Sequence, residues 1–225
     1  MSTLNNSFFI PRQELEDRVS FSFTPDLVGY DSIVPLREVV SIHHMAFMQH
    51  SQLEALIRSI PLRSVSLDKT FPYKCSRIQI FEIEPKGLSI GQTFVLKPKL
   101  LNIMSHLHSI FEGYVTKGIS KMLPTQIYGA TAGGTRVMAF YLPPLIEQHN
   151  GGYTLLDGIH RSYLCSSAGT PITVVEVNRV GVPLPFDPIS WKDICVVDEK
   201  PPILERYRNL QTSYFRDLAY VGFDG

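Results

Sequence analysis

The sequence predicts an α/β or α+β fold, with a small mixed sheet and helices packed on it. Segments that alternate apolar and polar residues, as strands do, are interleaved with segments whose apolar residues recur every three or four positions, as on one face of a helix. Apolar residues make up 44% of the 225 positions and charged residues only 19%, so the chain can bury a substantial core. Asn-Gly, Gly-Gly and Pro-Pro pairs separate the segments.

Residues 1–72 are expected to form an N-terminal elaboration, because five prolines divide them into short pieces. One helix is predicted from Ser51, whose hydroxyl and the Glu54 carboxylate can each accept from a free backbone amide in a capping box. Its apolar face consists of Leu53, Leu56, Ile57 and Ile60.

Residues 73–180 carry most of the regular pattern and are predicted to be the main domain. Alternation and β-branched residues indicate strands, and helical periodicity indicates the helices between them. One sheet is expected from 77–83, 136–142, 145–148, 153–156 and 172–177, with helices 99–112 and 161–168 on it, and smaller elements are a strand at 93–96 and a helix at 115–122.

Two connections in this domain have clear turn signals. Asn150-Gly151 separates two short apolar segments and suits a hairpin turn that needs positive φ. Residues 123–135, which hold Gly133-Gly134, are expected to form a mobile loop near a site.

Residues 181–225 are expected to be a C-terminal extension. Its first part, 181–202, carries five prolines and is predicted to wrap the surface, and 201–218 is predicted to form one amphipathic helix. The apolar stripe of that helix is expected to pack onto the domain or onto a second copy of the chain, which would make a homo-oligomer.

Charge and cysteine content restrict the partners and the compartment. The 21 basic residues balance the 21 acidic ones, so no overall field attracts the chain to nucleic acid or to an anionic membrane. Three widely spaced cysteines without a Cys-x-x-Cys pair indicate a reduced protein. The N-terminus lacks a signal-peptide pattern and no apolar run reaches about 18 residues, so we expect a cytoplasmic protein.

The densest polar cluster is Asp157-Gly158-Ile159-His160-Arg161, at the junction of a predicted strand and a predicted helix. Free amides and a partial positive charge make a helix N-terminus a natural anion site, and Gly158 lets the backbone approach the anion. Arg161 offers a planar fork for phosphate, His160 can exchange a proton near neutral pH, and Asp157 can hold a divalent metal or orient the pocket. The alternative is structural: Asp157 caps the helix, Arg161 pairs with a surface carboxylate and His160 is half-buried.

The run from Pro144-Leu-Ile-Glu through Tyr153-Thr-Leu-Leu-Asp-Gly-Ile-His-Arg-Ser-Tyr-Leu to Pro171-Ile-Thr-Val-Val resembles the core of the ParB/sulfiredoxin superfamily. The resemblance covers about residues 76–178 and is sharpest over 144–177. It implies a ParB/sulfiredoxin-like core in which a glycine-containing turn with a basic pair receives nucleotide phosphates. Relatives of this kind include CTP-binding ParB proteins, ATP-using sulfiredoxins and a free serine kinase.

The resemblance places Gly158, His160 and Arg161 at the phosphates of ATP or CTP, with Ser162 beside them and Asp157 at the edge as the site for Mg²⁺. Sulfiredoxins carry their catalytic cysteine where this chain has Ile159, so sulfinic acid reduction is not expected. Cys165 is expected to point into the core. The extension after residue 180 is too short for the helix-turn-helix region that ParB partition proteins usually carry.

Phosphoryl transfer also needs a carboxylate to position the attacking hydroxyl. Glu82 and Glu84, at the end of the first main-domain strand, are the candidates, and the alternative is that they are exposed strand charges. Lys97 and Lys99 would approach the nucleotide in the superfamily arrangement, or else are solvated lysines at a helix start.

These observations predict a nucleotide-binding protein that transfers or hydrolyses phosphate, with a small molecule or a protein as the acceptor. One alternative is a ParB-like DNA-associated nuclease or regulator, which the zero net charge disfavours. Another is a non-catalytic interaction module with a degenerate turn.

Overall fold

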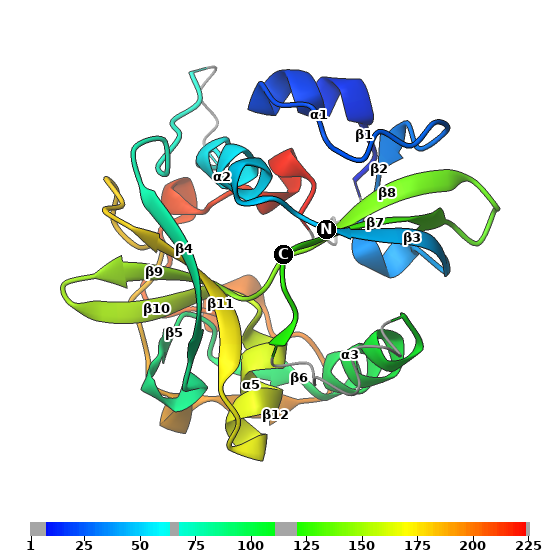
Figure 1. The fold of residues 1–225 in the computed structure, drawn as a ribbon. Helices are drawn as coiled ribbons and strands as arrows, with labels where there is room; N and C mark the ends of the chain where they lie inside the picture. The colour runs from blue at the N-terminus through cyan, green and yellow to red at the C-terminus, as the bar shows by residue number, and fades with distance from the viewer. Residues whose placement is uncertain (1–7, 64–67, 111–120, 224–225) are drawn as a thin grey trace.

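The computed structural model describes residues 8–63, 68–110 and 121–223, with residues 106–110 described by their backbone alone. Within them the chain folds into two five-stranded mixed sheets and one two-stranded sheet, with helices packed around them. Figure 1 shows helices α1 and α2 at one end of the molecule and α3 and α5 at the other. This α+β arrangement of small mixed sheets confirms the predicted fold class.

The first sheet has the strand order β1-β2-β8-β7-β3. Strands β8 and β7 pair antiparallel, and β7 also pairs antiparallel with β3. Strands from residues 1–72 and from the predicted main domain therefore share one sheet. The strands are β1 (Ile10–Pro11), β2 (Ser32–Ile33), β8 (Arg136–Tyr141), β7 (Thr125–Ala130) and β3 (Ser41–Phe47).

The prediction of a mobile loop over 123–135 is wrong, because β7 lies inside it and is buried along its whole length. Its glycine serves packing rather than flexibility. A Cβ atom added at Gly129 would collide with the carbonyl oxygen of Ser41 on the neighbouring strand. Only Thr131 to Thr135 form the turn, closed by a 3.0 Å bond from the Thr131 amide to the Thr135 carbonyl.

The second sheet has the order β4-β11-β9-β10-β5, so the prediction that 136–142 belongs to it is wrong. The Pro143-Pro144 segment takes the chain from β8 in the first sheet to β9 in the second. The other four predicted strands are confirmed, and the edge strand β5 is additional. The strands are β4 (Arg77–Ile83), β11 (Ile172–Asn178), β9 (Leu145–His149), β10 (Gly152–Asp157) and β5 (Ser89–Ile90).

The predicted hairpin turn joins β9 to β10. Asn150 has φ 50° and Gly151 has φ 79°, as a two-residue turn of this kind requires. The two strands pair antiparallel from Gly152 opposite His149 onward.

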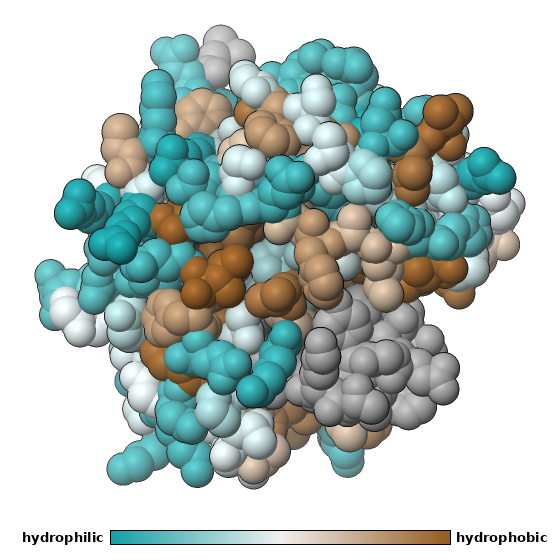
Figure 2. Space-filling view, viewed as in Figure 1, coloured by the Kyte–Doolittle hydropathy of each residue, from teal (hydrophilic) through white to brown (hydrophobic). Residues whose placement is uncertain are grey.

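Core residues lie on both faces of the second sheet. Strand β11 is buried on both faces, whereas β4 is only partly buried, as its alternation predicts. Ile78, Val175 and Val177 join a core with α1, α2 and the first sheet, whereas Ile172 and Val174 join a second core beneath α5. Figure 2 shows hydrophobic residues gathered over β4 and β11 in the middle of one face, with hydrophilic residues around them.

Helix α2 (His50–Arg58) confirms the predicted N-terminal helix, and Leu53, Leu56, Ile57 and Ile60 are all buried. The predicted capping box is wrong by two residues. The backbone amide of Gln49 donates to Oε1 of Gln52 at 2.8 Å, and Glu54 instead pairs with Arg58 at 3.1 Å. Gln52 is buried, and its Oε1 also accepts a 3.0 Å hydrogen bond from Nε2 of Gln126.

The remaining helices are α1 (Arg12–Val19), α3 (Lys97–Ile110) and α5 (Ile159–Ala168). Helices α3 and α5 confirm the predictions for 99–112 and 161–168, each starting two residues earlier. The predicted helix at 115–122 falls, except for its last two residues, outside the described residues. No helix in the described ranges is long and apolar enough to cross a membrane.

The predicted helix over 201–218 is wrong. The segment holds only short 3₁₀ turns, because its backbone bonds to distant parts of the chain: the Thr93 amide donates to the Arg206 carbonyl at 3.0 Å and the Arg63 amide to the Phe215 carbonyl at 2.6 Å. A regular helix uses these groups internally. The turns are η5 (Ile203–Glu205), η6 (Thr212–Tyr214) and η7 (Leu218–Val221), and earlier ones are η1 (Leu36–Glu38), η2 (Pro85–Gly87) and η4 (Trp191–Asp193).

The predicted short strand at 93–96 is confirmed as β6 (Phe94–Leu96). It pairs in parallel with β12 (Cys195–Val197) of the C-terminal extension. This small sheet ties the extension to the start of α3.

Candidate functional site

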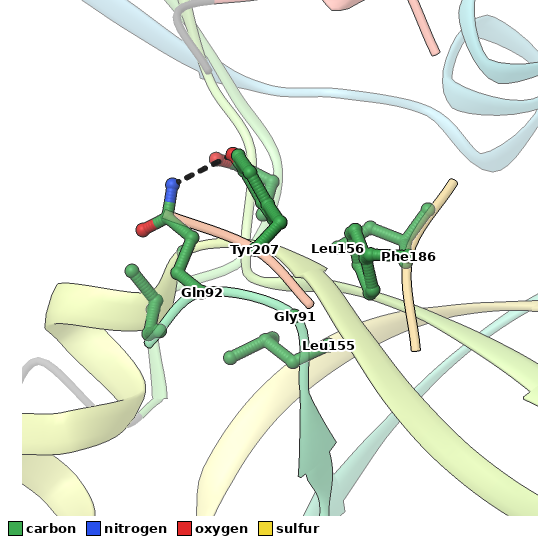
Figure 3. Close-up of a pocket in the computed structure, with 9 residues that line it drawn as sticks. Gly91, Gln92, Leu155, Leu156, Phe186 and Tyr207 are labelled. Atoms are coloured by element: carbon green, nitrogen blue, oxygen red, sulfur yellow. Dashed lines mark hydrogen bonds between the residues drawn. The ribbon is translucent and has the colours of Figure 1, made fainter. Parts of the chain in front are cut away.

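The candidate site is the turn at Gly158, at the carboxyl ends of two parallel neighbouring strands. Strand β10 pairs with β5 so that Leu155 lies opposite Ile90. Gly91 and Gln92 therefore follow β5 (Figure 3). Asp157 and Gly158 follow the paired part of β10 at the same edge, and all four residues line one cavity. The β9–β10 register shifts between Leu155 and Asp157, and such a bulge re-aims the residues after it. Strand ends of this kind are common places for ligand sites.

Glycine is required at position 158 for two reasons. Its φ of 85° is left-handed, and a Cβ atom there would lie 2.8 Å from the Cα atom of Pro144. The turn is therefore packed against the proline segment that links the two sheets.

Helix α5 begins directly after this glycine, and no described side chain caps it. The first amides of a helix have no acceptor within the helix, and they carry a partial positive charge of about half a unit. The start of α5 thus presents hydrogen-bond donors next to Gly158, where an anion can accept from them.

His160 lies in the first turn of α5 and is buried, with 7% of its surface exposed. Its Nε2 accepts a 3.0 Å hydrogen bond from the backbone amide of Leu96, which requires the neutral ring with the proton on Nδ1. Burial, together with the charges of Lys99, Arg161 and Lys200, lowers the pKa of His160 to about 3. The prediction of proton exchange near neutral pH is therefore corrected: His160 joins β6 to α5 as a neutral residue.

Arg161 braces the turn instead of pointing freely toward a ligand. Its Nη1 donates to the carbonyl of Leu142, its Nη2 lies 3.4 Å from Oδ2 of Asp157, and its guanidinium lies 5.1 Å from the centre of the Tyr141 ring. The side chains of Arg161 and Asp157 keep 13% and 16% of their surface exposed. The Arg161–Asp157 pair is therefore partly open to a ligand at the turn.

A small cavity opens beside the turn. Its volume is about 30 Å³, which holds roughly two water molecules. Oε1 of Gln92 is buried and has no partner among the described residues, whereas its Nε2 donates to the hydroxyl of Tyr207 at 3.1 Å (Figure 3). The lining also includes Phe186, whose ring stacks on Tyr207 with centroids 5.4 Å apart. The cavity accepts a small polar group and is too small for a nucleoside.

Lys99, Lys200 and Arg206 are three cations of the segments beside the start of α5, and the two lysines are exposed. The charges of Lys99 and Lys200 act on His160, and burial together with the charges of Arg206 and Lys99 lowers the pKa of Lys200. In the described part of the chain, no ion pair joins any of the three to a carboxylate. The same C-terminal segment also carries the exposed carboxylates of Asp198, Glu199 and Glu205.

The two predicted base candidates lie elsewhere on the sheet. Strand β4 is separated from β10 by β11 and β9, a distance of about 14 Å at three strand spacings. Glu82 is exposed and lies 3.6 Å from the ammonium of Lys121, and Glu84 is exposed just before η2. The structure does not bring either carboxylate to the turn.

Two other predicted residues do not line the cavity. Lys97 is exposed at the first position of α3, and its charge is not among those that act on His160. Ser162 is fully buried in α5, and its Oγ has no partner among the described residues. Cys165 is buried, as expected, and burial raises its thiol pKa.

The predicted Mg²⁺ site would depend on Asp157. The described residues contain no group of three His, Cys, Asp or Glu side chains that could hold a metal ion. Mg²⁺ commonly takes only one or two carboxylates and completes its shell with water and phosphate oxygens. Asp157 fits that pattern only if the ligand brings the other oxygens.

A second polar centre, which the sequence analysis missed, surrounds Glu147. Arg216 binds its two carboxylate oxygens at 2.7 and 2.8 Å, Nε2 of His149 lies 2.6 Å from Oε2, and the hydroxyl of Tyr73 donates to Oε1. Burial raises the pKa of Tyr73, and the neighbouring charge of Glu147 raises it further. The one available signal was that Glu147 lies two residues after Leu145, on a strand position that faces a core.

Sequence reasoning also missed Gln92 at the turn, and it assigned Tyr207 to the apolar face of the predicted helix over 201–218. Their positions follow from the pairing of the C-terminal extension with residues 92–96, which no local pattern shows.

Comparison with protein-family models gives no match for this chain. Neither does comparison with curated proteins, nor comparison with solved structures. The likeness to the ParB/sulfiredoxin superfamily remains a prediction from the sequence.

Proposed function

We propose that this protein binds the phosphate groups of a nucleotide, with ATP or CTP as the ligand class, at the N-terminus of α5. The observation that supports it is the combination of an uncapped helix start after Gly158 with three cations that have no described acidic partner. Positive groups placed together raise one another's energy, and a bound polyanion relieves that cost. Helix starts of this kind are effective phosphate sites.

The phosphate end of the ligand would lie at the turn, and the nucleoside would lie outside the cavity. The cavity volume of about 30 Å³ admits a phosphate oxygen with its water but no base. Asp157 and the phosphate oxygens would share Mg²⁺, because Asp157 is a partly exposed carboxylate at the edge of the turn.

Phosphoryl transfer or hydrolysis is the second part of the proposal. Since Glu82 lies on β4, which β11 and β9 separate from β10, and Glu84 follows the end of β4, Asp157 is the predicted catalytic carboxylate that lies at the turn. An acceptor, a small molecule or a protein, would approach from the exposed side of Asp157.

Calorimetric titration of the full chain with ATP and CTP, with and without Mg²⁺, tests the binding. Arg161→Ala is expected to weaken binding at least about tenfold, because it removes a charge and loosens the turn. Asp157→Asn separates the two roles of the carboxylate: it should strengthen binding without Mg²⁺ and weaken it with Mg²⁺. Unchanged affinity in both variants would show that the nucleotide binds elsewhere.

The same titrations decide between the alternatives. A nucleotide that binds only the native state must raise its melting temperature, so no shift with any nucleotide would favour the non-catalytic interaction module. Binding to duplex DNA with a steep loss on added salt would favour the DNA-associated alternative.

A further inference from the structure

We infer that the cavity beside Gly158 binds the end of a neutral small molecule that carries a primary alcohol, and that Gln92 recognises its hydroxyl. The inference goes beyond the proposed function, because it concerns the cavity alone and needs neither a nucleotide nor an anion. It rests on the size of the cavity, on its lining and on one buried oxygen atom that has no hydrogen-bond partner among the described residues.

The cavity lies between the edge of the second sheet and the C-terminal extension. The ends of β5 and β10 and the start of α5 form one side, and Phe186 and Tyr207 form the other (Figure 3). An antiparallel bridge pairs Gln92 with Tyr207, whose ring stacks on that of Phe186 at an interplanar angle of 13°. A Cβ atom added at Gly91 would collide with the ring of Phe186. The cavity is therefore enclosed on this side by closely packed aromatic rings.

The lining combines apolar side chains with a few polar ones. The apolar side chains are Leu155, Leu156, Ile159 and Phe186. The polar ones are the amide of Gln92, the carboxylate of Asp157 and the hydroxyl of Tyr207. Small-molecule sites typically have this composition, in which a few polar groups fix the orientation of a ligand among apolar contacts.

One hydrogen-bond acceptor of this lining has no donor. Nε2 of Gln92 donates to the Tyr207 hydroxyl at 3.1 Å, whereas Oε1 of the same amide is buried and has no partner among the described residues. A buried acceptor without a donor costs free energy, so a group that donates to it is favoured at this place. The ligand group is therefore a donor, which a deprotonated phosphate oxygen is not.

The volume and the charge of the lining restrict that donor further. A cavity of about 30 Å³ holds roughly two water molecules, and hence about two non-hydrogen atoms of a ligand. The carbon and oxygen atoms of a primary alcohol fit this space, with the carbon against Leu155 and Ile159 and the hydroxyl donating to Gln92. An ammonium group is disfavoured, because the carboxylate of Asp157 is already paired with Arg161 at 3.4 Å.

Three isomers with the same formula test the inference: butan-1-ol, butan-2-ol and methyl propyl ether. Saturation-transfer NMR with the full chain, without nucleotide, measures their dissociation constants. Butan-1-ol should bind at least about fivefold more tightly than methyl propyl ether, which has the same number of atoms but no proton to donate to Oε1. It should also bind at least about fivefold more tightly than butan-2-ol, whose branch exceeds the space for two atoms.

Gln92→Met tests the assigned residue, because it removes the amide and keeps the length of the side chain. Butan-1-ol should bind this variant about fivefold more weakly than the parent, and no more tightly than methyl propyl ether does. The melting temperature without ligand should stay close to that of the parent, because the variant loses both the bond to Tyr207 and the unpartnered oxygen.

Gln211→Met is the matched control, because Gln211 is an exposed glutamine of the extension that does not line the cavity. It should bind the three isomers as the parent does. Equal affinity of the parent for butan-1-ol and methyl propyl ether, no binding of butan-1-ol, or unchanged binding in Gln92→Met would overturn the inference. These titrations contain no nucleotide and the nucleotide titrations contain no alcohol, so the failure of one proposal leaves the other in place.

Discussion

Two arginine–carboxylate pairs lie in this protein and differ in how completely they are closed. Arg216 binds Glu147 through two bonds of 2.7 and 2.8 Å, with 2% and 0% of the side chains exposed. Arg161 reaches Asp157 through a single 3.4 Å contact, with 13% and 16% exposed. The Glu147 centre is closed by donors inside the protein, whereas the Asp157 pair keeps part of its surface exposed. A short, closed pair indicates structure, and a long, open pair beside free helix amides indicates a site.

The largest expected effect comes from breaking the closed pair. Arg216→Met leaves the Glu147 carboxylate buried without its main counter-charge and should lower the free energy of unfolding by about 3–5 kcal/mol. Urea denaturation measures it. Arg208→Met, which removes an exposed 3.8 Å pair with Asp193, should cost less than about 1 kcal/mol. Equal losses of unfolding free energy in the two variants would show that the buried pair contributes no more to stability than the exposed pair.

A double variant tests whether the loss of stability in Arg216→Met is due to the unpaired buried charge. Glu147→Leu combined with Arg216→Met removes both charges, and it should recover much of the stability that Arg216→Met loses. A double variant no more stable than the single one would attribute the loss to packing instead.

The next effect tests the backbone of the open site. Gly158→Ala should destabilise the protein by about 2–4 kcal/mol, because it adds left-handed strain to a 2.8 Å approach to Pro144. Gly134→Ala is the matched control: its φ is 78°, but a Cβ atom there meets nothing within 4 Å. It should cost about 1 kcal/mol, as expected for backbone strain alone. Similar losses for the two would mean that the contact with Pro144 is not tight.

A smaller effect follows from His160. Its pKa is about 3 in the folded chain against 6.5 as the ordinary value, so the unfolded chain takes up the proton first as pH falls. The stability that the neutral ring provides is complete above pH 6.5 and is lost progressively down to pH 3. Between pH 6.5 and 5.5 the free energy of unfolding should fall by about 1 kcal/mol from this group. His160→Gln should remove that part of the pH dependence, and an identical pH profile in the variant would contradict it.

The smallest effect on stability is expected at the open carboxylate. Asp157→Asn should change the free energy of unfolding by less than about 1 kcal/mol, because a single long contact is lost at a partly exposed place. Glu147→Gln is the counterpart at the closed centre and should cost more, about 1–3 kcal/mol, since the amide cannot accept from all its donors. If Asp157→Asn were the more damaging of the two, the Asp157 pair would be structural and the comparison would be reversed.

Local patterns predicted the elements that depend on neighbours in sequence. Alternation located β4 and β11, the Asn150-Gly151 turn located the hairpin, and the turn at Gly158 was predicted as the place where a strand meets a helix. These features follow from φ preferences and from which face of each strand is apolar, both of which can be read within a few residues.

The misassigned elements depend on pairing between distant residues. Residues 123–135 were predicted to be a mobile loop, although Gly129 within them allows Ser41 to approach from a strand more than eighty positions earlier. Apolar residues in 203–218 have helical spacing by coincidence, while their backbone pairs with residues 62–63 and 92–93. For the same reason Glu147 and Arg216 gave no local sign of their contact.

The pairing of the C-terminal extension determines when the site can form during synthesis. The loop of residues 198–207 is laid along β6, and Arg216 binds Glu147 in the second sheet. A ribosome releases the chain from its N-terminus, so the first sheet can assemble from residues 10–141 well before these contacts exist. Until residue 216 emerges, the nascent chain carries the Glu147 carboxylate without its arginine and the Gly158 turn without its loop. The proposed site at Gly158 is therefore among the last parts of the molecule to form.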